Sequence, residues 1–214
     1  MLVHGIAMDD AALVVARKAI DDKGVAGQAS VEKASLDPLP YMSNLANIVV
    51  IDDWAAVSAK GLTKAEAMRV LAPGGALLVL ENGQWSKTVK PRPAEMDDWR
   101  FPMHDVGLTR TSKDKTFSFP IGLRWTDGVP NDIRGFTDCC GVIVVNNTIF
   151  TLNSAEIENV PQPRTEAGIP IYLVARDAFN GLPLWKFNLE IPNTGIAINA
   201  GDVPALAGDD DSVY

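Results

Sequence analysis

Two stretches in the first half of the chain decide its fold: residues 47–53 read NIVVIDD, and residues 69–79 read RVLAPGGALLV. Each contains an apolar run of strand length, at Asn47–Ile51 and at Ala76–Leu80. Apolar runs without the polar alternation of a half-exposed strand are typical of parallel strands buried on both faces. We therefore predict two such strands, joined by the residues that lie between them.

The segment between these two strands carries the signals of a helix and a turn. Thr63 can cap a helix that runs through Leu71, and Glu66 stands at the third helical position, where a capping box places its acidic residue. Pro73-Gly74-Gly75 then predicts a sharp turn into the next strand, because proline stops a helix and glycine accepts positive φ angles.

The N-terminal residues repeat the alternation of strand and helix. Leu2–Ile6 is a short apolar run that predicts a strand. Ala11–Lys23 has helical composition and spacing, with Asp9 or Asp10 as its N-cap, and Gln28–Lys33 predicts a further strand. Strands and helices that alternate in this way predict α/β layering.

Beyond residue 83 the sequence changes character. Lys87–Pro93 combines prolines with basic residues, and we interpret residues 84–98 as a linker between an α/β module at 1–83 and an all-β region at 99–214. Asn146-Asn147 lies between two apolar runs and predicts a two-residue hairpin turn. Short β-type runs at this spacing suit a sandwich, a barrel or a propeller. The predicted strands are Ile121–Trp125, Gly141–Val145, Thr148–Leu152, Ile171–Ala175 and Leu184–Leu189.

Composition excludes several classes of function. The 214 residues carry a formal net charge of −8, so phosphate backbones repel the chain and we expect no nucleic-acid partner. No apolar run approaches the roughly 20 residues of a membrane-spanning helix. The N-terminal MLVHGIAMDD lacks the basic and apolar regions of a signal peptide. The two cysteines, Cys139 and Cys140, are adjacent, which fits no zinc spacing, and we predict no metal site.

Residues 39–80 resemble the class I S-adenosylmethionine-dependent methyltransferases. Leu39-Pro40-Tyr41 followed by NIVVIDD is similar to the loop and fourth strand of that family. RVLAPGG at residues 69–75 is similar to its R-V-L-K-P-G-G signature of helix, turn and strand. The resemblance implies a Rossmann-like sheet with the methyl donor bound across the carboxyl ends of its strands.

The same resemblance implies where acids that bind the cofactor belong. The family's ribose-binding acid corresponds to Ala7, with Asp9 two residues later. Its adenine-binding acid corresponds to Ser35, with Asp37 two residues further on. Asp52 follows the fourth strand at the cleft end. Asp9, Asp37 and Asp52 are therefore the candidate cofactor-binding residues, and we predict no catalytic residue.

Aligned on the family, the chain starts within the second strand, so the first strand and its glycine-rich loop are not among its residues. We expect a sheet whose strand order is disturbed at that position. We also expect no S-adenosylmethionine to be bound by this chain, because the loop and both acids are absent from their family positions. The alternative is an active methyltransferase in a longer parent protein that supplies the loop and binds S-adenosylmethionine.

Residues 97–214 resemble the propeller repeats of the pyrroloquinoline-quinone type. Trp99–Asp105 with Thr109-Arg110-Thr111 is similar to the opening segment of such propellers, and Leu123–Thr126 is similar to the strand that follows. Val174–Trp185 is similar to the A-x-D-x-x-x-G-x-x-x-W tryptophan-docking motif. The resemblance implies a partial propeller with one clear blade, because at least four blades of about 40–50 residues close a ring.

The docking motif implies structural roles for four residues. Asp177 and Gly181 belong to a tight turn, in which glycine takes a positive φ. Ala175 is small and lets a neighbouring blade approach closely. Trp185 packs as a large flat group between blades and buries on the order of 150–250 Å².

These observations lead to three hypotheses. The first is a fragment of a larger protein, with a methyltransferase-like module that lacks activity here and a propeller that binds or scaffolds. Its expected partners are the remainder of the parent polypeptide, or further copies that pair through exposed strand edges. The second is the active parent methyltransferase.

The third hypothesis is a quinone-dependent dehydrogenase. Adjacent cysteines such as Cys139-Cys140 form a disulfide ring beside the quinone in some quinoproteins. We expect no pyrroloquinoline quinone here, because the calcium and cofactor ligands have no counterparts in the chain. The fused architecture is compatible with an exported or periplasmic parent, and the sequence leaves the localisation open.

Overall fold

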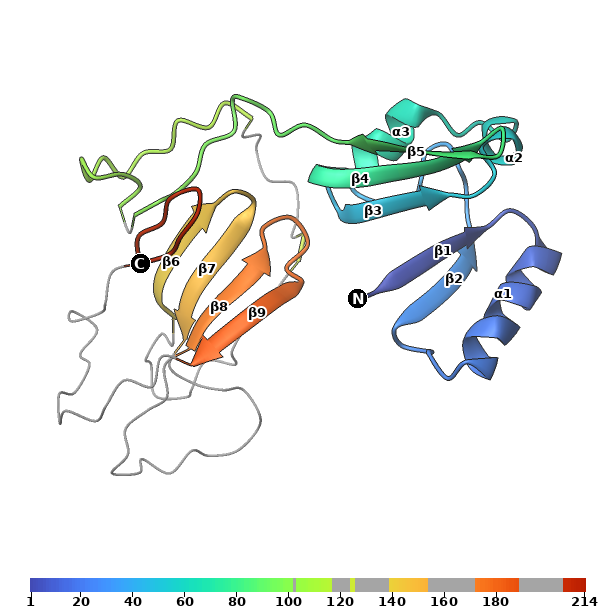
Figure 1. Ribbon diagram of the computed structural model, residues 1–214, viewed down its shortest axis with the longest axis horizontal. Helices are drawn as coiled ribbons and strands as arrows, with labels where there is room; N and C mark the ends of the chain where they lie inside the picture. Colours follow the sequence, from blue (N-terminus) through green and yellow to red (C-terminus); the bar gives the residue numbers. More distant parts are fainter. Residues whose placement is uncertain (102, 117–123, 126–138, 154–171, 189–205) are drawn as a thin grey trace. The chain divides into compact units, whose positions relative to one another are not determined.

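A computed structural model describes residues 1–101, 103–116, 124–125, 139–153, 172–188 and 206–214. The chain divides into two compact units, Met1–Pro91 and Arg92–Tyr214 (Figure 1). Each unit has its own sheets and its own core, so each is described separately. No helix in the described part of the chain is long and apolar enough to cross a membrane.

The first unit is α/β, as the sequence predicts. Strands β1 and β2 are parallel, β3 and β4 are parallel, and β5 pairs with β4 in the antiparallel direction. The strands form two separate sheets, β1-β2 and β3-β4-β5, so the strand order is interrupted as expected. The elements are β1 (Val3–Ala7), α1 (Asp10–Asp22), β2 (Ala29–Lys33), β3 (Ala46–Ile51), α2 (Trp54–Ser58), α3 (Lys64–Val70), β4 (Leu71–Glu81) and β5 (Gln84–Val89).

Capping residues set the starts of the helices. The Asp9 carboxylate accepts a hydrogen bond from the backbone N–H of Ala12 at 2.8 Å, which makes Asp9 the N-cap of α1. Thr63 caps α3 in the same way, because its hydroxyl accepts from the N–H of Glu66 at 3.0 Å. The predicted capping box is only half formed, since the Glu66 carboxylate accepts instead from the N–H of Leu39 at 2.7 Å.

The Pro73-Gly74-Gly75 segment is not the predicted turn. Helix α3 gives way to β4 directly at Leu71, and the three residues form an irregular part of β4. Gly74, with φ 81°, donates to the carbonyl of Lys90 at 2.8 Å, and Lys90 donates to the carbonyl of Gly75 at 2.9 Å. A Cβ on Gly75 would lie 2.8 Å from the Ala72 carbonyl oxygen, so only glycine fits there.

Strand β5 occupies residues that the sequence suggested as the start of a linker. Asn82-Gly83 connects it to β4 in a two-residue turn with φ of 51° and 75°, which is the conformation that Asn-Gly favours in hairpins. All six β5 residues are exposed, so the strand shows none of the apolar alternation that marks a half-buried strand.

Within the described residues of the first unit, the sheet of β3, β4 and β5 is covered on one face only, which corrects the expectation of strands buried on both faces. Helices α2 and α3 contact β4, and the buried core includes Ile51, Leu77 and Val79. The residues that alternate with these point to the other face, because neighbours along a strand point to opposite sides. That face is called here the bare face. Its most exposed apolar residues are Ile48 (56% exposed), Val50 (59%), Trp85 (56%) and Val89 (50%).

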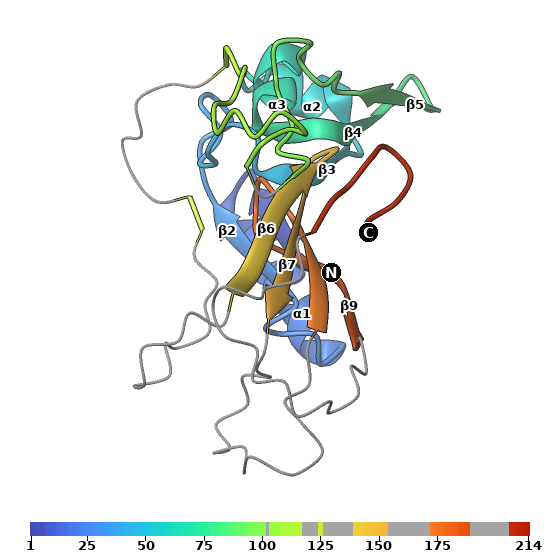
Figure 2. The ribbon, with the colours of Figure 1, turned by 90° about the vertical axis from the view of Figure 1, so that its left-hand side faces the viewer.

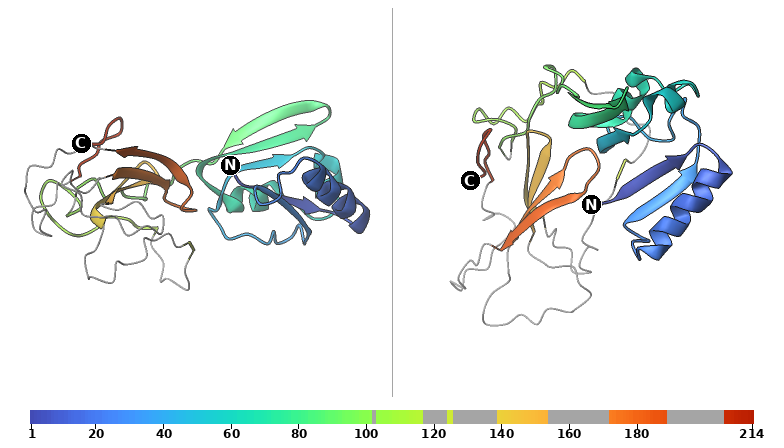
Figure 3. Two further views of the ribbon diagram at one scale, coloured as in Figure 1. Left: turned by 90° about the horizontal axis from the view of Figure 1, so that it is seen from below. Right: turned by 45° about the vertical axis from the view of Figure 1, so that its right-hand side comes forward.

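The β1-β2 pair is covered by α1, as Figure 3 shows. Helix α1 has no buried residue, and Val14 and Val15 are exposed on its outer side. Ile6 and Met8 pack against the core beneath β3 and β4, which ties the two small sheets into one unit.

The second unit contains a four-stranded antiparallel sheet in the simple order β6-β7-β8-β9, whose strands lie side by side (Figure 2). Asn146 and Asn147 form the predicted hairpin turn, with φ of 47° and 66°. Of the strand predicted at 121–125, Arg124 and Trp125 are not in a strand, and the remaining residues lie outside the described ones. The elements are β6 (Cys139–Val145), β7 (Thr148–Asn153), β8 (Tyr172–Asp177) and β9 (Pro183–Asn188).

A distant segment completes the core of this sheet. Leu206, which is 5% exposed, packs with the buried Ile143 and Val145 of β6, and Val213 packs against the same cluster. The N–H of Gly208 donates to the carbonyl of Arg100 at 3.0 Å, so both ends of the unit meet at this sheet.

Candidate functional site

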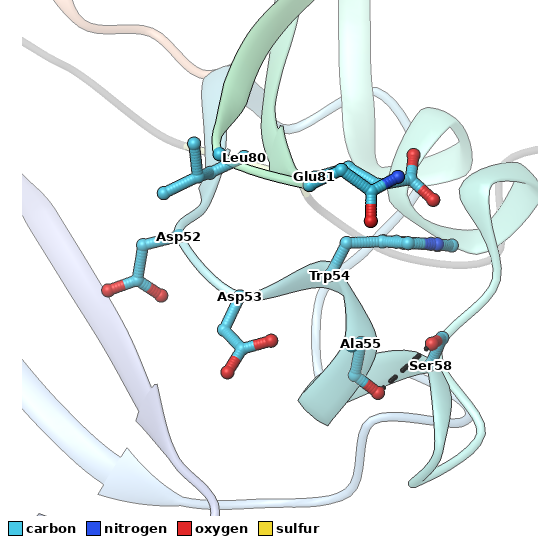
Figure 4. Close-up of a pocket in the computed structure, with 9 residues that line it drawn as sticks. Asp52, Asp53, Trp54, Ala55, Ser58, Leu80 and Glu81 are labelled. Atoms are coloured by element: carbon cyan, nitrogen blue, oxygen red, sulfur yellow. Dashed lines mark hydrogen bonds between the residues drawn. The ribbon is translucent and has the colours of Figure 1, made fainter.

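An open hollow of about 410 Å³ lies at the carboxyl ends of β3 and β4 (Figure 4). Ligands of open α/β sheets bind at this end of the strands, where loops rather than helices surround the sheet. The lining residues come from the start of α2 and from the β4–β5 turn: Asp52, Asp53, Trp54, Ala55, Ser58, Leu80, Glu81, Asn82 and Gly83.

The carboxylate of Asp53 in this hollow is engaged in capping. It accepts a hydrogen bond from the N–H of Ala56 at 2.9 Å and so begins α2. Asp52, its neighbour, is exposed, and its carboxylate points away from Trp54 in Figure 4. The hollow thus contains one predicted cofactor-binding residue, Asp52, next to an acid that serves the fold.

An ion pair covers the aromatic wall of the hollow. The Lys64 Nζ lies 5.1 Å from the centre of the Trp54 ring and 3.2 Å from Glu81 Oε2. Both charged side chains are about half exposed, so the pair contributes at most about 1 kcal/mol. Trp54 therefore already has a cation against its ring.

The other two predicted acids do not line the hollow. Asp9 is the N-cap of α1, and its carboxylate is used by the N–H of Ala12. Asp37 is exposed in the loop after β2, where its backbone N–H donates to Ser35 Oγ at 3.1 Å and its carbonyl accepts from the same hydroxyl at 2.9 Å. Asp9, Asp37 and Asp52 thus each belong to a separate loop.

The two positions that carry cofactor-binding acids in the family, Ala7 and Ser35, lie at the end of β1 and shortly after β2. The loop that follows β1 is Met8-Asp9, and one carboxylate oxygen of Asp9 accepts the cap hydrogen bond of α1. A carboxylate that binds both hydroxyls of a diol accepts one hydrogen bond at each of its oxygens. A contact of this kind contributes about 1–3 kcal/mol to the free energy of binding. In unit 1, the positions Ala7 and Ser35 that the family gives to such acids carry no carboxylate.

A partly buried charge cluster beside the sheet was not predicted from the sequence. Arg69 donates to Glu66 Oε1 at 2.7 Å, to the Tyr41 carbonyl at 2.9 Å and to the Leu39 carbonyl at 3.3 Å. The hydrogen bond from Arg69 lowers the pKa of Glu66, against a smaller opposing effect of burial. The pair fixes the loop before β3 to α3, and its only sequence signal is the i, i+3 spacing of Glu66 and Arg69.

Lys90 closes the same loop from the other side. Its Nζ donates to Asn44 Oδ1 at 2.6 Å and to the Leu71 carbonyl at 2.7 Å. Burial lowers the pKa of Lys90, and the nearby charge of Arg69 lowers it further. These contacts are structural, because all of them end on backbone or on a loop amide.

His4 is bound to a neighbour rather than to a catalytic group. Its ring hydrogen-bonds the Tyr41 hydroxyl, and its Nε2 lies 3.8 Å from Glu32. Burial, and then the charge of Glu32, raises the pKa of Tyr41. His4 lies in the amino-terminal half of β1 and is not among the residues that line the hollow.

In the second unit, Asp177 and Gly181 lie in a tight turn between β8 and β9. Asp177 Oδ1 accepts from the N–H of Phe179 at 2.8 Å and of Asn180 at 3.1 Å, and Gly181 has φ 73°. The Trp125 indole lies against Gly181, since a Cβ there would be 2.5 Å from the ring. Trp125 Nε1 also donates to the carbonyl of Ala178 at 3.2 Å.

Ala175 and Trp185 are cross-strand neighbours in this sheet. Ala175 is fully buried, whereas Trp185 is 45% exposed with its ring centre 5.8 Å from that of Phe150. A tryptophan packed between two sheets is expected to be largely covered. Trp185 is covered on its Phe150 side and exposed elsewhere.

Known proteins share sequence with part of this chain. No family model matches it. The ubiquinone/menaquinone biosynthesis C-methyltransferase UbiE of Shewanella pealeana is 37% identical over 75 residues, which cover 35% of this chain and 30% of that protein. UbiE of Ectopseudomonas mendocina is 36% identical over 96 residues, which cover 42% and 35%. The chain thus spans about a third of the length of these curated relatives.

Two solved structures superpose on part of this chain at low sequence identity. A protein of Methanococcus maripaludis described as an S-adenosyl-L-methionine-dependent methyltransferase superposes with a TM-score of 0.30 at 17% identity, over 36% of this chain and 35% of that one. The [4+2]-cyclase SpnF superposes with a TM-score of 0.33 at 20% identity, over 49% and 36%. The sequence similarity to the methyltransferases supports a methyltransferase-like α/β character for the chain.

Proposed function

We propose that the first unit is a methyltransferase-like binding module that does not transfer methyl groups in this chain, and that it belongs to a longer protein. The observation that carries the proposal is the use of Asp9 and Asp53 as helix caps. A carboxylate that accepts from a helix N-terminus is held in place by the cap and has fewer lone pairs to offer a ligand. The hollow retains Asp52 and Trp54 as contacts for a different small molecule.

Calorimetric titration of the 214-residue chain with S-adenosylmethionine tests this proposal. We expect no binding heat, because Ala7 and Ser35 stand where the family has its cofactor-binding acids and carry no carboxylate. Binding with a micromolar Kd would overturn the proposal. Asp52→Asn is the matched control for such a signal, because it keeps the size of the side chain and removes an exposed acid of the hollow that neither caps a helix nor pairs with Lys64.

The alternative is methyltransferase activity in the longer parent protein. The sequence similarity to UbiE, which is named as a C-methyltransferase, favours it. The same titration on the parent separates the alternatives, since a parent that binds the methyl donor when this chain does not must supply the missing contacts.

For the second unit, we propose a blade of a propeller that serves as a binding or scaffolding module. The observation that favours it is the docking of Trp125 on the turn at Gly181, with its Nε1 hydrogen bond to Ala178. Trp185 stands at the tryptophan position of the docking motif itself. Its exposed ring is available to dock on a further turn of this kind.

Substitution of Gly181 by alanine tests the docking. The added methyl group would lie 2.5 Å from the Trp125 ring, so we expect the ring to be displaced from the turn. The chemical shift of its indole N–H should then move towards the value of a solvent-exposed tryptophan. Gly83→Ala is the matched control, because Gly83 also has a positive φ, 75°, but no atom lies within 4 Å of the new carbon. An unchanged Trp125 resonance in G181A contradicts the docking.

A quinone-dependent dehydrogenase is the other alternative for this unit. The backbone of Cys139 and Cys140 begins β6, and their side chains lie outside the described part. Reconstitution of the parent with pyrroloquinoline quinone and calcium, followed by a dye-reduction assay with alcohols and sugars, tests it. We expect no dye reduction.

A further inference from the structure

The dipeptide Asn-Gly occurs in two turns of the described chain. Asn82-Gly83 connects β4 to β5 in the first unit, and Asn180-Gly181 lies between β8 and β9 in the second. Both glycines have a positive φ, 75° for Gly83 and 73° for Gly181. Because the residue pair is the same, any difference in reactivity between the two asparagines comes from their conformations and surroundings.

An asparagine that precedes glycine can react with its own backbone. The glycine nitrogen loses its proton and attacks the side-chain Cγ, so that a new N–C bond forms and the bond from Cγ to Nδ2 breaks. The side-chain nitrogen leaves as ammonia and carries the displaced proton. Water then opens the five-membered succinimide ring at either carbonyl, which gives aspartate or isoaspartate with no oxidation or reduction. Glycine favours the attack because it has no Cβ to shield its nitrogen or to restrict backbone rotation.

Asn82-Gly83 is open to this reaction. Both residues are exposed, and no atom lies within 4 Å of the position that a Cβ on Gly83 would take. Among the described residues, the N–H of Gly83 donates no hydrogen bond and the side-chain amide of Asn82 has no hydrogen-bond partner. Neither the attacking nitrogen nor the leaving group is therefore held by a neighbour.

The reaction at Asn82 proceeds when its hairpin turn opens. The left-handed φ of Asn82, 51°, belongs to the closed turn, and ring closure requires the backbone of this residue to rotate out of that conformation. Strand β5 lies at the edge of its sheet, and all six of its residues are exposed. A strand with so little buried surface separates locally at a low cost in free energy.

Asn180-Gly181 is held in place by its surroundings. The N–H of Gly181 donates to the Asp177 carbonyl at 2.9 Å, so the attacking nitrogen is occupied. The Asn180 side-chain oxygen accepts from the N–H of Leu182 at 3.0 Å, and the Asn180 N–H donates to Asp177 Oδ1 at 3.1 Å. Gly181 is buried against the Trp125 ring. Ring closure in this turn therefore requires several contacts to break first.

We propose that Asn82 is a site of spontaneous deamidation in the folded chain and that Asn180 is protected from the same reaction. Asn82 lines the hollow together with Asp52, Asp53 and Glu81, so its deamidation adds a carboxylate to a wall that already carries three. The added charge favours cationic ligands over anionic ones. This consequence, unlike the reaction itself, rests on the proposed use of the hollow as a binding site.

The isoaspartate product also alters the hairpin. The main chain then continues through the side-chain carbonyl, which adds one backbone atom to a two-residue turn. Glu81 and Gln84 pair directly across this turn, and the length of the turn fixes the register of the two strands. We therefore expect the pairing of β5 with β4 to loosen in chains that carry isoaspartate.

Peptide mapping by mass spectrometry tests the proposal on the full chain aged in slightly alkaline ¹⁸O-labelled water. Each succinimide that is hydrolysed takes up one oxygen atom of the water, so the label marks the product formed during ageing, whether or not the hollow binds a ligand. We expect the label to accumulate at Asn82 at least about tenfold faster than at Asn180. In urea, which unfolds both turns, the two rates should converge because the dipeptide is the same.

Two variants make the outcome decisive. Asn82→Gln keeps the amide but requires a six-membered ring, so the label at residue 82 should be lost. Asp177→Ala removes the Oδ1 acceptor of the protected turn, so labelling of Asn180 should rise while labelling of Asn82 stays the same. Equal labelling of Asn82 and Asn180 in the folded native chain would overturn the proposal, as would an unlabelled Asn82 in a chain that reacts in urea.

Discussion

The sheets of the two units are covered by different kinds of segment. In the first, α2 and α3 cover one face of β3-β4-β5, and the bare face displays Ile48 and Val50. In the second, a segment more than 60 residues away in sequence, at Leu206, seals Ile143 and Val145. The first sheet is therefore covered by helices close to it in sequence, and the second by a segment much further along the chain, a contact that costs more loop entropy to make.

The largest expected effect comes from the core of the second unit. Ile143→Ala removes a fully buried side chain and should lower the free energy of unfolding of that unit by about 2–5 kcal/mol. Val142→Ala is the matched control on the opposite face, where the side chain is 44% exposed. Amide hydrogen exchange resolves the units, and a loss of protection in Met1–Pro91 as well would show that the two unfold together.

A smaller effect is expected from the charge cluster of the first unit. Glu66→Gln keeps the volume but weakens the hydrogen bonds to Arg69, so we expect a loss of about 1–3 kcal/mol in urea unfolding at pH 7. Because the pKa of Glu66 is lowered in the folded chain, its contribution is present above the unfolded-state pKa and is lost as the pH falls through the folded-state value.

The pH dependence provides the check on this interpretation. The native chain and E66Q should differ in stability at pH 7 and converge in acid. A difference that persists at the lowest pH at which the chain stays folded would assign the effect to packing rather than to charge.

The helix cap of α3 should have an effect of about 1 kcal/mol. Thr63→Ala removes the acceptor for the N–H of Glu66 and leaves that donor to solvent. Thr63→Ser keeps the hydroxyl and serves as the control. Equal stability of T63A and T63S in urea unfolding would show that the hydroxyl at residue 63 does not stabilise this helix.

The smallest effect is expected on the bare face. Val50→Thr replaces a methyl group by a hydroxyl at a residue that is 59% exposed, so we expect a change within about 0.5 kcal/mol. Val79→Thr, in which the original side chain is 2% exposed, should cost several times more. Similar losses for the two variants would mean that the bare face is covered in solution.

The contrast between the units also explains what the sequence predicts well. The caps at Asp9 and Thr63 and the hairpin turn at Asn146-Asn147 are local, because the acceptor or the φ angle lies within three residues of the signal. Each of them is confirmed. The bulge at Pro73-Gly74-Gly75 depends on the register with β3 and on Lys90, and local residues alone favour a turn there.

The candidate site shows the same division between features that local residues determine and features that depend on distant parts of the chain. The spacing of Asp53 from Ala56 permits a cap and a ligand contact equally, and only the positions of the backbone atoms decide between them. The Trp125 contact spans 56 residues to Gly181, and no pattern within either segment indicates it. Strand β5 was missed for a different reason, since a fully exposed edge strand has no apolar alternation to detect.

The bare face has a consequence for the response of the first unit to temperature. The heat capacity of unfolding grows with the apolar surface that becomes exposed, and the side chains of Ile48, Val50, Trp85 and Val89 are already half hydrated in the folded state. The unit should therefore show a small heat-capacity step in calorimetry and a flat stability curve. Its free energy of unfolding would then change little between cold and warm conditions, while a ligand that covers this face would give the stability curve a more pronounced curvature.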